Sequence, residues 1–184
     1  NRPNFKVVGS GPTGMLLSIA LSELNLNIFL TDLLTRERLI DKDKTYAITH
    51  STRLILEKFN LWHKLKPYLF GFDSLSITDS VTTDFIDLNI SDFDDDIVTA
   101  NNIGWVIKHS DLMNVLFQEI DNRKNIIFKS TQELETDKVS IDYQFLSTGA
   151  NSVEKNFSKF INYKKLYNQS CLTFKVLVRG NHEK

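Results

Sequence analysis

The sequence predicts an α/β fold in which a parallel sheet with helices is interrupted by antiparallel strands. The first observation is the order strand, glycine turn, helix, strand over residues 5–32, which is the pattern of a βαβ unit. The second is a change of pattern: residues 72–106 hold short strand-like runs, and helical spacing returns only at Ser110. A plain nucleotide-binding sheet would keep alternating strands and helices, so the middle segment indicates a β-rich insertion.

The opening unit sets the direction of the sheet. Residues 5–8 are a short apolar strand that ends at Gly9, and Pro12 suits the first turn of a helix. The helix then repeats apolar residues at helical spacing, which predicts a stripe that packs on the sheet: Leu17, Ala20, Leu21 and Leu24. Residues 27–31 form the next strand, closed by Asp32, and we expect this strand to lie parallel to the first.

The remaining elements follow from local patterns. Residues 33–44 read as a polar loop, and a helical segment starts near Thr49 and reaches about Leu65, with Phe59 and Trp62 on its apolar side. A later helix starts at Ser110, and the last residues before it are strand-like. The predicted strands are residues 75–78, 85–90, 105–107, 126–128, one or two within 139–146, and 172–178, with a turn at 149–152.

Composition limits the functions to consider. The 184 residues carry a formal net charge of −1, which gives no case for nucleic-acid binding. Cys171 is the single cysteine, so we predict a buried small side chain there and no internal disulfide. The histidines lack zinc-ligand spacing, the acidic run after Asp92 lacks the glycine of a calcium loop, and we predict no metal. No stretch is apolar enough to cross a membrane, and we expect a cytoplasmic location.

The glycine-rich turn carries the chemistry. Gly9, Gly11 and Gly14 form a G-x-G-x-x-G pattern between a strand and a helix, and Asp32 lies 18 residues after Gly14. In a dinucleotide site, such glycines allow a tight turn, backbone approach to a pyrophosphate and close helix–strand packing, while the acid binds ribose hydroxyls. The alternative is a glycine turn shaped for packing alone. Because the domain is interrupted after its second helical segment, the pattern favours FAD over NAD.

Several motifs, in order, resemble the flavin-dependent aromatic hydroxylases, and among them the ubiquinone-biosynthesis monooxygenases most. They are residues 7–14 with Asp32, residues 44–48 followed by 51–56 and 61–62, residues 104–107 with Leu112, residues 146–153, and residues 163–178. The resemblance implies a glutathione-reductase-like FAD-binding Rossmann domain with a β-rich substrate-domain insertion. It also implies a domain of residues 1–70 and 108–160 that binds FAD, with residues 71–107 and 161–184 belonging to the substrate-binding domain.

The sequence departs from the family at three places. Lys44 stands where the family has an arginine that reaches FAD, and Thr148 stands where the family has an aspartate. Glu154-Lys155 replaces the valine–arginine ending of the same motif only loosely. His109 occupies a place that meets the FAD phosphates in relatives, and we weigh that contact against a surface helix-capping role. The family's third motif is absent after Val178, and with a chain that begins at Asn1 without methionine we expect a C-terminally truncated protein.

The resemblance implies an FAD-dependent monooxygenase that hydroxylates an aromatic ring with NAD(P)H and O2, in ubiquinone-type quinone biosynthesis. The implied substrate is a small aromatic compound, in particular a prenylated phenol, with peripheral association at the inner membrane face or with a quinone-biosynthesis complex. The predicted cofactor contacts are Gly9, Gly11, Pro12, Thr13, Gly14, Asp32, Lys44 and His109; no catalytic residue is assigned. The alternatives are an FAD-dependent reductase or dehydrogenase of the same fold and a non-catalytic nucleotide-binding relative.

Overall fold

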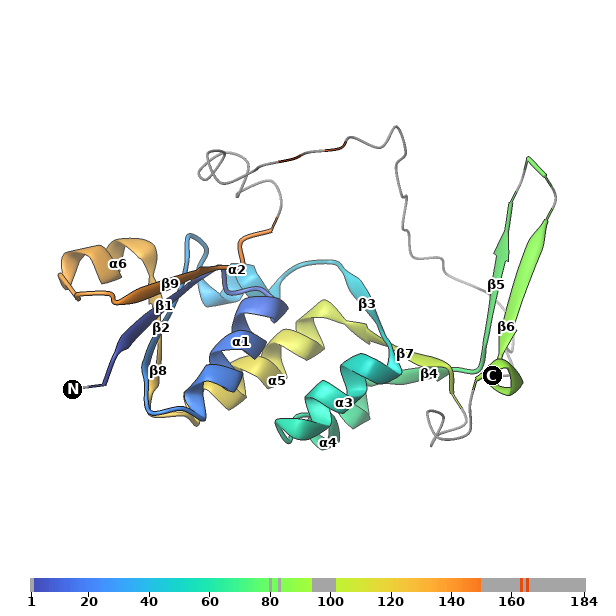
Figure 1. Ribbon diagram of the computed structural model, residues 1–184, viewed down its shortest axis with the longest axis horizontal. Helices are drawn as coiled ribbons and strands as arrows, with labels where there is room; N and C mark the ends of the chain where they lie inside the picture. The colour runs from blue at the N-terminus through green and yellow to red at the C-terminus, as the bar shows by residue number, and fades with distance from the viewer. Residues whose placement is uncertain are drawn as a thin grey trace. The chain divides into compact units, whose positions relative to one another are not determined.

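The computed structural model describes residues 2–79, 81–82, 84–93, 102–149, 163 and 165. The chain divides into two units, Asn1–Gly149 and Ala150–Lys184, and the fold below is that of the first (Figure 1). Cys171, the strand predicted at 172–178 and turn residues 150–152 lie outside the described residues.

A four-stranded parallel sheet forms the base of the first unit. Its strands are β1 (Asn4–Val8), β2 (Asn27–Asp32), β8 (Ile126–Ser130) and β9 (Tyr143–Leu146), in the order β8-β2-β1-β9. All three pairings are parallel, with Val7 opposite Leu30 on one side and Phe145 on the other. The prediction that the second strand lies parallel to the first is confirmed, because α1 (Pro12–Ser22) provides the crossover that parallel neighbours need.

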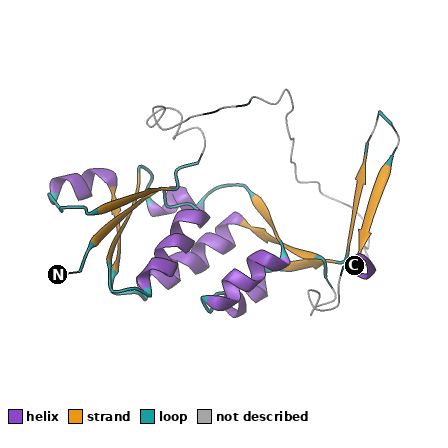
Figure 2. Ribbon diagram, viewed as in Figure 1, coloured by secondary structure: helices purple, strands orange, loops and turns teal. Residues whose placement is uncertain are grey.

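Helices α1 and α5 (His109–Asp121) pack against each other beside this sheet (Figures 1 and 2). The predicted stripe on α1 is correct only in part: Leu17 and Leu21 pack against the core, but Leu24 is exposed and the buried residues are Gly14, Met15, Ser18 and Ile19. The cause is that α1 is apolar on all sides and contacts both the sheet and α5, so spacing alone did not identify the side facing the core.

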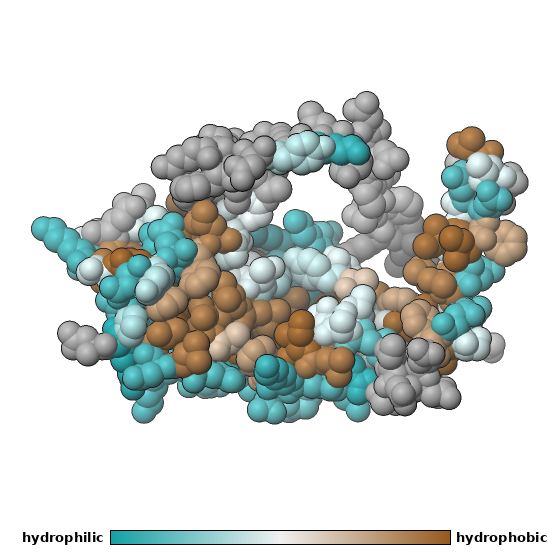
Figure 3. Space-filling model, in the orientation of Figure 1, coloured by the Kyte–Doolittle hydropathy of each residue, from teal (hydrophilic) through white to brown (hydrophobic). Residues whose placement is uncertain are grey.

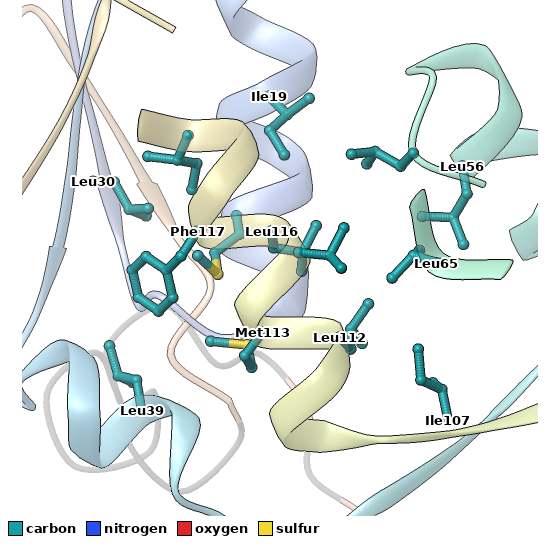
Figure 4. Close-up of a cluster of buried hydrophobic side chains, with 14 of the residues drawn as sticks. Ile19, Leu30, Leu39, Leu56, Leu65, Ile107, Leu112, Met113, Leu116 and Phe117 are labelled. Carbon is teal, nitrogen blue, oxygen red and sulfur yellow. The ribbon is translucent and has the colours of Figure 1, made fainter. Parts of the chain in front are cut away.

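The core is built around α5 (Figure 4). Phe117 and Met113 point toward Leu30 of the sheet and Leu39, and Phe117 meets the Phe128 ring edge-on at 5.4 Å between centroids. On the other side of α5, Leu112 and Leu116 face Leu56, Leu65 and Ile107, which belong to other helices and to a strand outside the parallel sheet. One helix thus joins the sheet to the rest of the unit.

The shorter helices lie on either side of this core. They are α2 (Arg36–Ile40), α3 (His50–Lys58), α4 (Trp62–Leu65) and α6 (Thr131–Thr136), with a 3-10 turn at Lys66–Tyr68. The helical segment predicted to run to Leu65 is broken at Asn60, which has φ 57°. Leu61 N–H donates to Leu56 O at 2.8 Å and Asn60 N–H donates to Glu57 O at 3.0 Å, which is a Schellman cap that ends α3.

The antiparallel strands predicted for the middle of the chain are present. In one group, β7 (Gly104–Lys108) pairs with β3 (Thr45–Ile48) and β4 (Phe70–Phe72), both antiparallel. In the other, β5 (Ser74–Thr78) and β6 (Phe85–Asn89) form a hairpin that a 3-10 turn at Ile90–Asp92 follows. The register of the hairpin puts four apolar side chains on one face: Leu75, Ile77, Ile86 and Leu88. Figure 3 shows apolar surface over this hairpin.

Candidate functional site

Four strand ends meet at one edge of the parallel sheet. Gly9 follows β1, Asp32 ends β2, Ser130 ends β8, and Ser147 follows β9. In the strand order β8-β2-β1-β9, β2 and β8 lie on one side of β1, and β9 lies on the other. The direction in which strands are added therefore reverses at β1. Ligands of open α/β sheets bind at the carboxyl ends of strands at such a reversal, so this edge is the candidate site.

The turn after β1 is fixed to the end of β9. Ser147 N–H donates to Val8 O at 2.8 Å, and the Ser147 hydroxyl contacts Val8 O and Gly9 O, each at 3.0 Å. Gly9 has φ 100°, and a Cβ there would lie 2.6 Å from Ser147 O. Only glycine satisfies both the left-handed backbone and this close approach.

Gly14 and Gly11 have different surroundings. A Cβ on Gly14 would lie 1.8 Å from Gly9 O, so glycine is required there by the packing of α1 against the turn. A Cβ on Gly11 would have no neighbour within 4 Å among the residues that the structure describes. The fold itself therefore explains Gly9 and Gly14, whereas the space beside Gly11 is open to a ligand.

The first turn of α1 begins at this open space. Gly11 is the N-cap residue with no side-chain cap, Pro12 follows, and the first turn holds no acidic residue. Thr13, the next predicted contact, is exposed. A helix start without a side-chain cap carries unpaired N–H groups and partial positive charge, which suit phosphate oxygens.

Asp32 is held rigidly beside the glycine turn. Its Oδ2 accepts from Ser10 N–H at 2.7 Å, and its Oδ1 accepts from Leu34 N–H at 3.0 Å. Each carboxylate oxygen that accepts one hydrogen bond can accept another. Asp32 can therefore bind a ribose hydroxyl while it continues to fix the turn.

Two buried hydroxyls beside the turn fit a polar ligand. Ser10 Oγ and Thr148 Oγ1 are inaccessible to water and have no hydrogen-bond partner within the described part of the chain. Thr148 also abuts the turn, because its Cα lies 2.9 Å from the position of a Cβ on Gly9. Buried polar groups without partners are uncommon in folded proteins, and a bound phosphate or ribose would supply partners here. The residues present thus fit a dinucleotide.

Lys44 lies at the other end of the segment that follows Asp32. Its side chain is exposed, and its residue directly precedes β3. Its carbonyl oxygen accepts from His109 N–H at 2.8 Å. The structure places the lysine at the surface; its predicted contact with FAD stays a prediction.

Of the two alternatives weighed for His109, the surface helix-capping role is wrong. His109 is 2% exposed, its Nε2 lies 2.6 Å from Leu39 O, and its Nδ1 lies 2.8 Å from Tyr46 Oη. A phosphate contact would require one of these bonds to break. Burial raises the pKa of Tyr46 above its usual value of 10.0, so this hydroxyl stays neutral at physiological pH.

Two residues of the site were missed from the sequence. Ser147 ties the turn to β9, and Tyr46 contacts the His109 ring. Ser147 stands before the Thr148-Gly149 pair, so its place after a strand was a usable signal, whereas the contact between Tyr46 and His109 joins residues 63 apart in the chain.

Among the residues that the structure describes, no helix is both long enough and apolar enough to span a bilayer.

No model of a known protein family matches the sequence. Two short similarities occur in known sequences. Autophagy-related protein 11 of Candida albicans is 34% identical over 74 residues, which are 39% of this chain and 6% of that protein. An uncharacterised protein, slr1300, of Synechocystis is 26% identical over 80 residues, 44% of this chain and 19% of that protein.

Solved structures of similar fold include monooxygenases and an oxygenase. p-Nitrophenol 4-monooxygenase PnpA from Pseudomonas putida DLL-E4 has a TM-score of 0.57 at 13% identity, over 70% of this chain and 32% of that one. PqsL of Pseudomonas aeruginosa, described as a probable FAD-dependent monooxygenase, has a TM-score of 0.54 at 10% identity, over 71% of this chain and 33% of that one. The 2-methyl-3-hydroxypyridine-5-carboxylic acid oxygenase has a TM-score of 0.55 at 11% identity, over 71% of this chain and 32% of that one.

At these identities the similarity establishes the fold. The described unit has an α/β fold similar to that of part of these three structures, one of which is a probable FAD-dependent monooxygenase. The chain spans about a third of the length of these structures.

Proposed function

We propose that this chain contains the dinucleotide-binding part of an FAD-dependent monooxygenase that hydroxylates an aromatic ring with NAD(P)H and O2. The observation that supports it most is the open space beside Gly11, at the start of α1 and next to Asp32. A glycine turn shaped for packing alone needs Gly9 and Gly14, whereas Gly11 has no packing contact that requires a glycine among the described residues. The similarity of fold to PqsL, a probable FAD-dependent monooxygenase, supports FAD as the cofactor.

The residues of the chain would hold the cofactor in defined ways. The first turn of α1, from Gly11 through Pro12, Thr13 and Gly14, would receive the pyrophosphate. Asp32 would accept hydrogen bonds from the adenosine ribose, and Lys44 would add positive charge near the same end. Bound FAD supplies the oxygen chemistry, while the protein positions it and excludes water.

The finer assignments extend the same proposal. Residues 1–70 and 108–160 would form the FAD-binding domain, and residues 71–107 and 161–184 would contribute to the substrate-binding domain in a glutathione-reductase-like arrangement. The substrate would be a small phenol, in particular a prenylated one of ubiquinone-type quinone biosynthesis. Such a substrate favours a cytoplasmic protein at the inner membrane face or in a quinone-biosynthesis complex. The antiparallel strands between α4 and α5 support the division into domains.

The test is to purify the full-length protein without added cofactor, denature it by heat, and identify any released flavin by chromatography and visible spectrum. Near-stoichiometric FAD supports the proposal and justifies assays of NAD(P)H oxidation with phenolic substrates. Absence of flavin, together with no uptake of titrated FAD, overturns it. Oxygen consumption without a hydroxylated product would favour a reductase or dehydrogenase of the same fold.

A non-catalytic nucleotide-binding relative is the second candidate. It is favoured by Thr148, where a neutral buried hydroxyl, without a partner among the described residues, occupies the place of the family's aspartate. Such a protein would bind ADP or FAD without turnover. Binding with no NAD(P)H oxidation across a panel of phenols would support this candidate.

A further inference from the structure

The segment of residues 33–44 joins the two proposed nucleotide contacts that flank it. Asp32 precedes it at the end of β2, and Lys44 ends it just before β3. Its helix α2 has only five residues, Arg36–Ile40, which is too short to be stable alone. Asp32 is already fixed by β2 and the glycine turn, so it is the placement of Lys44 relative to Asp32 that depends on what holds this segment against the rest of the fold.

His109, the first residue of α5, holds the segment at two points. Its ring Nε2 lies 2.6 Å from Leu39 O in α2, and its backbone N–H donates to Lys44 O at 2.8 Å. A carbonyl oxygen accepts only, so Nε2 carries the hydrogen and donates to Leu39 O, while Nδ1 lies 2.8 Å from the Tyr46 hydroxyl oxygen. The ring thus joins α2, β3 and α5.

Arg36 of α2 also contacts α5, with its guanidinium carbon 4.4 Å from the centre of the Phe117 ring. Arg36 Nη2 lies 2.7 Å from Asp121 Oδ2 at the far end of α5, but the two side chains are 38% and 52% exposed. Exposed ion pairs contribute little to stability because water screens them. The His109 ring is buried, and removal of its donor would leave Leu39 O buried without a partner.

We infer that His109 is a positioning residue that fixes segment 33–44 and so sets nucleotide affinity, without itself contacting the phosphates. Its effect on nucleotide binding rests on the proposed function. Its effect on the segment does not.

The experiment compares three variants of the full-length protein. His109→Asn removes the donor to Leu39 O, and His109→Gln keeps a donor at the position of Nε2. His50→Asn is the matched control, because His50 is also a buried histidine with its Nε2 2.9 Å from a carbonyl oxygen, that of Asn102. Limited trypsin digestion with mass spectrometry measures cleavage after Arg36, Arg38, Lys42 and Lys44, and titration measures the Kd for FAD.

His109→Asn should raise cleavage of the segment about tenfold, because the open population grows when a buried hydrogen bond is lost. Its Kd for FAD should rise about threefold to tenfold, as the binding-competent fraction falls. His109→Gln should restore both values toward wild type, and His50→Asn should leave segment cleavage unchanged.

Three results would overturn the inference: unchanged cleavage in His109→Asn, an equal rise in His50→Asn, or a raised cleavage with an unchanged Kd. If the wild-type protein binds no FAD, the proposed function fails, and the cleavage comparison alone decides whether His109 fixes the segment.

Discussion

Alanine at Gly11 and alanine at Gly14 should have opposite consequences, although both glycines belong to one turn. At Gly14 the new Cβ would lie 1.8 Å from Gly9 O, a backbone atom that no rotamer change can move. Overpacking costs about 1–3 kcal/mol, and the upper end applies when backbone must shift. Alanine recovers about 1 kcal/mol of helix propensity, so the free energy of unfolding should fall by about 2 kcal/mol.

At Gly11 the new Cβ meets nothing within 4 Å in the described residues. Alanine at this N-cap should change the free energy of unfolding by less than about 1 kcal/mol. If the open space receives the pyrophosphate, however, the methyl group should raise the Kd for FAD at least about tenfold, because close backbone approach is lost.

The assay is urea unfolding followed by circular dichroism, paired with FAD titration of each variant. A Gly11→Ala protein that binds FAD as tightly as wild type would refute the assignment of that space to the ligand. A Gly14→Ala protein of unchanged stability would refute the packing argument. A fall in stability at both positions would mean that the whole turn serves packing alone.

Three further results are expected. Asp32→Asn should lower the free energy of unfolding by about 1–3 kcal/mol, because the amide nitrogen would face the N–H group of either Ser10 or Leu34. Urea unfolding measures this free energy, and an unchanged value would show that these hydrogen bonds are not formed. Burial alone would raise the pKa of Glu119, but hydrogen bonds and charge from Lys64 and Arg123 outweigh it and hold that pKa below 4.5. Its stabilisation is therefore present above the unfolded-state pKa and lost as pH falls through the folded value, so Glu119→Gln should flatten the stability curve below about pH 4.5, and an unaltered acid limb would contradict this. Phe117→Ala should cost about 3–5 kcal/mol because the ring is fully buried between the sheet and α2; a loss under 1 kcal/mol in thermal or urea unfolding would contradict the core described.

Local sequence patterns predicted the elements whose structure depends on neighbouring residues in the chain. The βαβ unit, the glycine turn and the hairpin were predictable because strand alternation, glycine spacing and helical capping are encoded in neighbouring residues. The short helix α2 (Arg36–Ile40) was not, since the segment around it is rich in charged residues, and the burial of Leu39 comes from packing into a core that includes the distant helix α5. Strand β3 has four residues and forms because β7, from a distant part of the chain, pairs with it.

The site divides in the same way. Gly9, Gly14 and Asp32 could be placed from sequence because each role depends on the strand and helix next to it. The burial of His109 could not, because its ring partners, Leu39 and Tyr46, lie 70 and 63 residues away. A histidine at a helix start ordinarily faces solvent, and here the short helix α2 covers it.

Asp32 has two roles that a single substitution does not separate. Its carboxylate orders the turn through Ser10 N–H, and the same carboxylate is the proposed acceptor for the ribose. A weaker nucleotide affinity in Asp32→Asn would therefore combine a displaced turn with a lost ligand contact. The contributions separate in a double cycle that compares ADP with 2′-deoxy-ADP in both proteins, because only the ribose contact depends on the 2′-hydroxyl. If removing that hydroxyl weakens binding equally in wild type and variant, Asp32 acts through the turn alone, and the ribose contact must be assigned elsewhere.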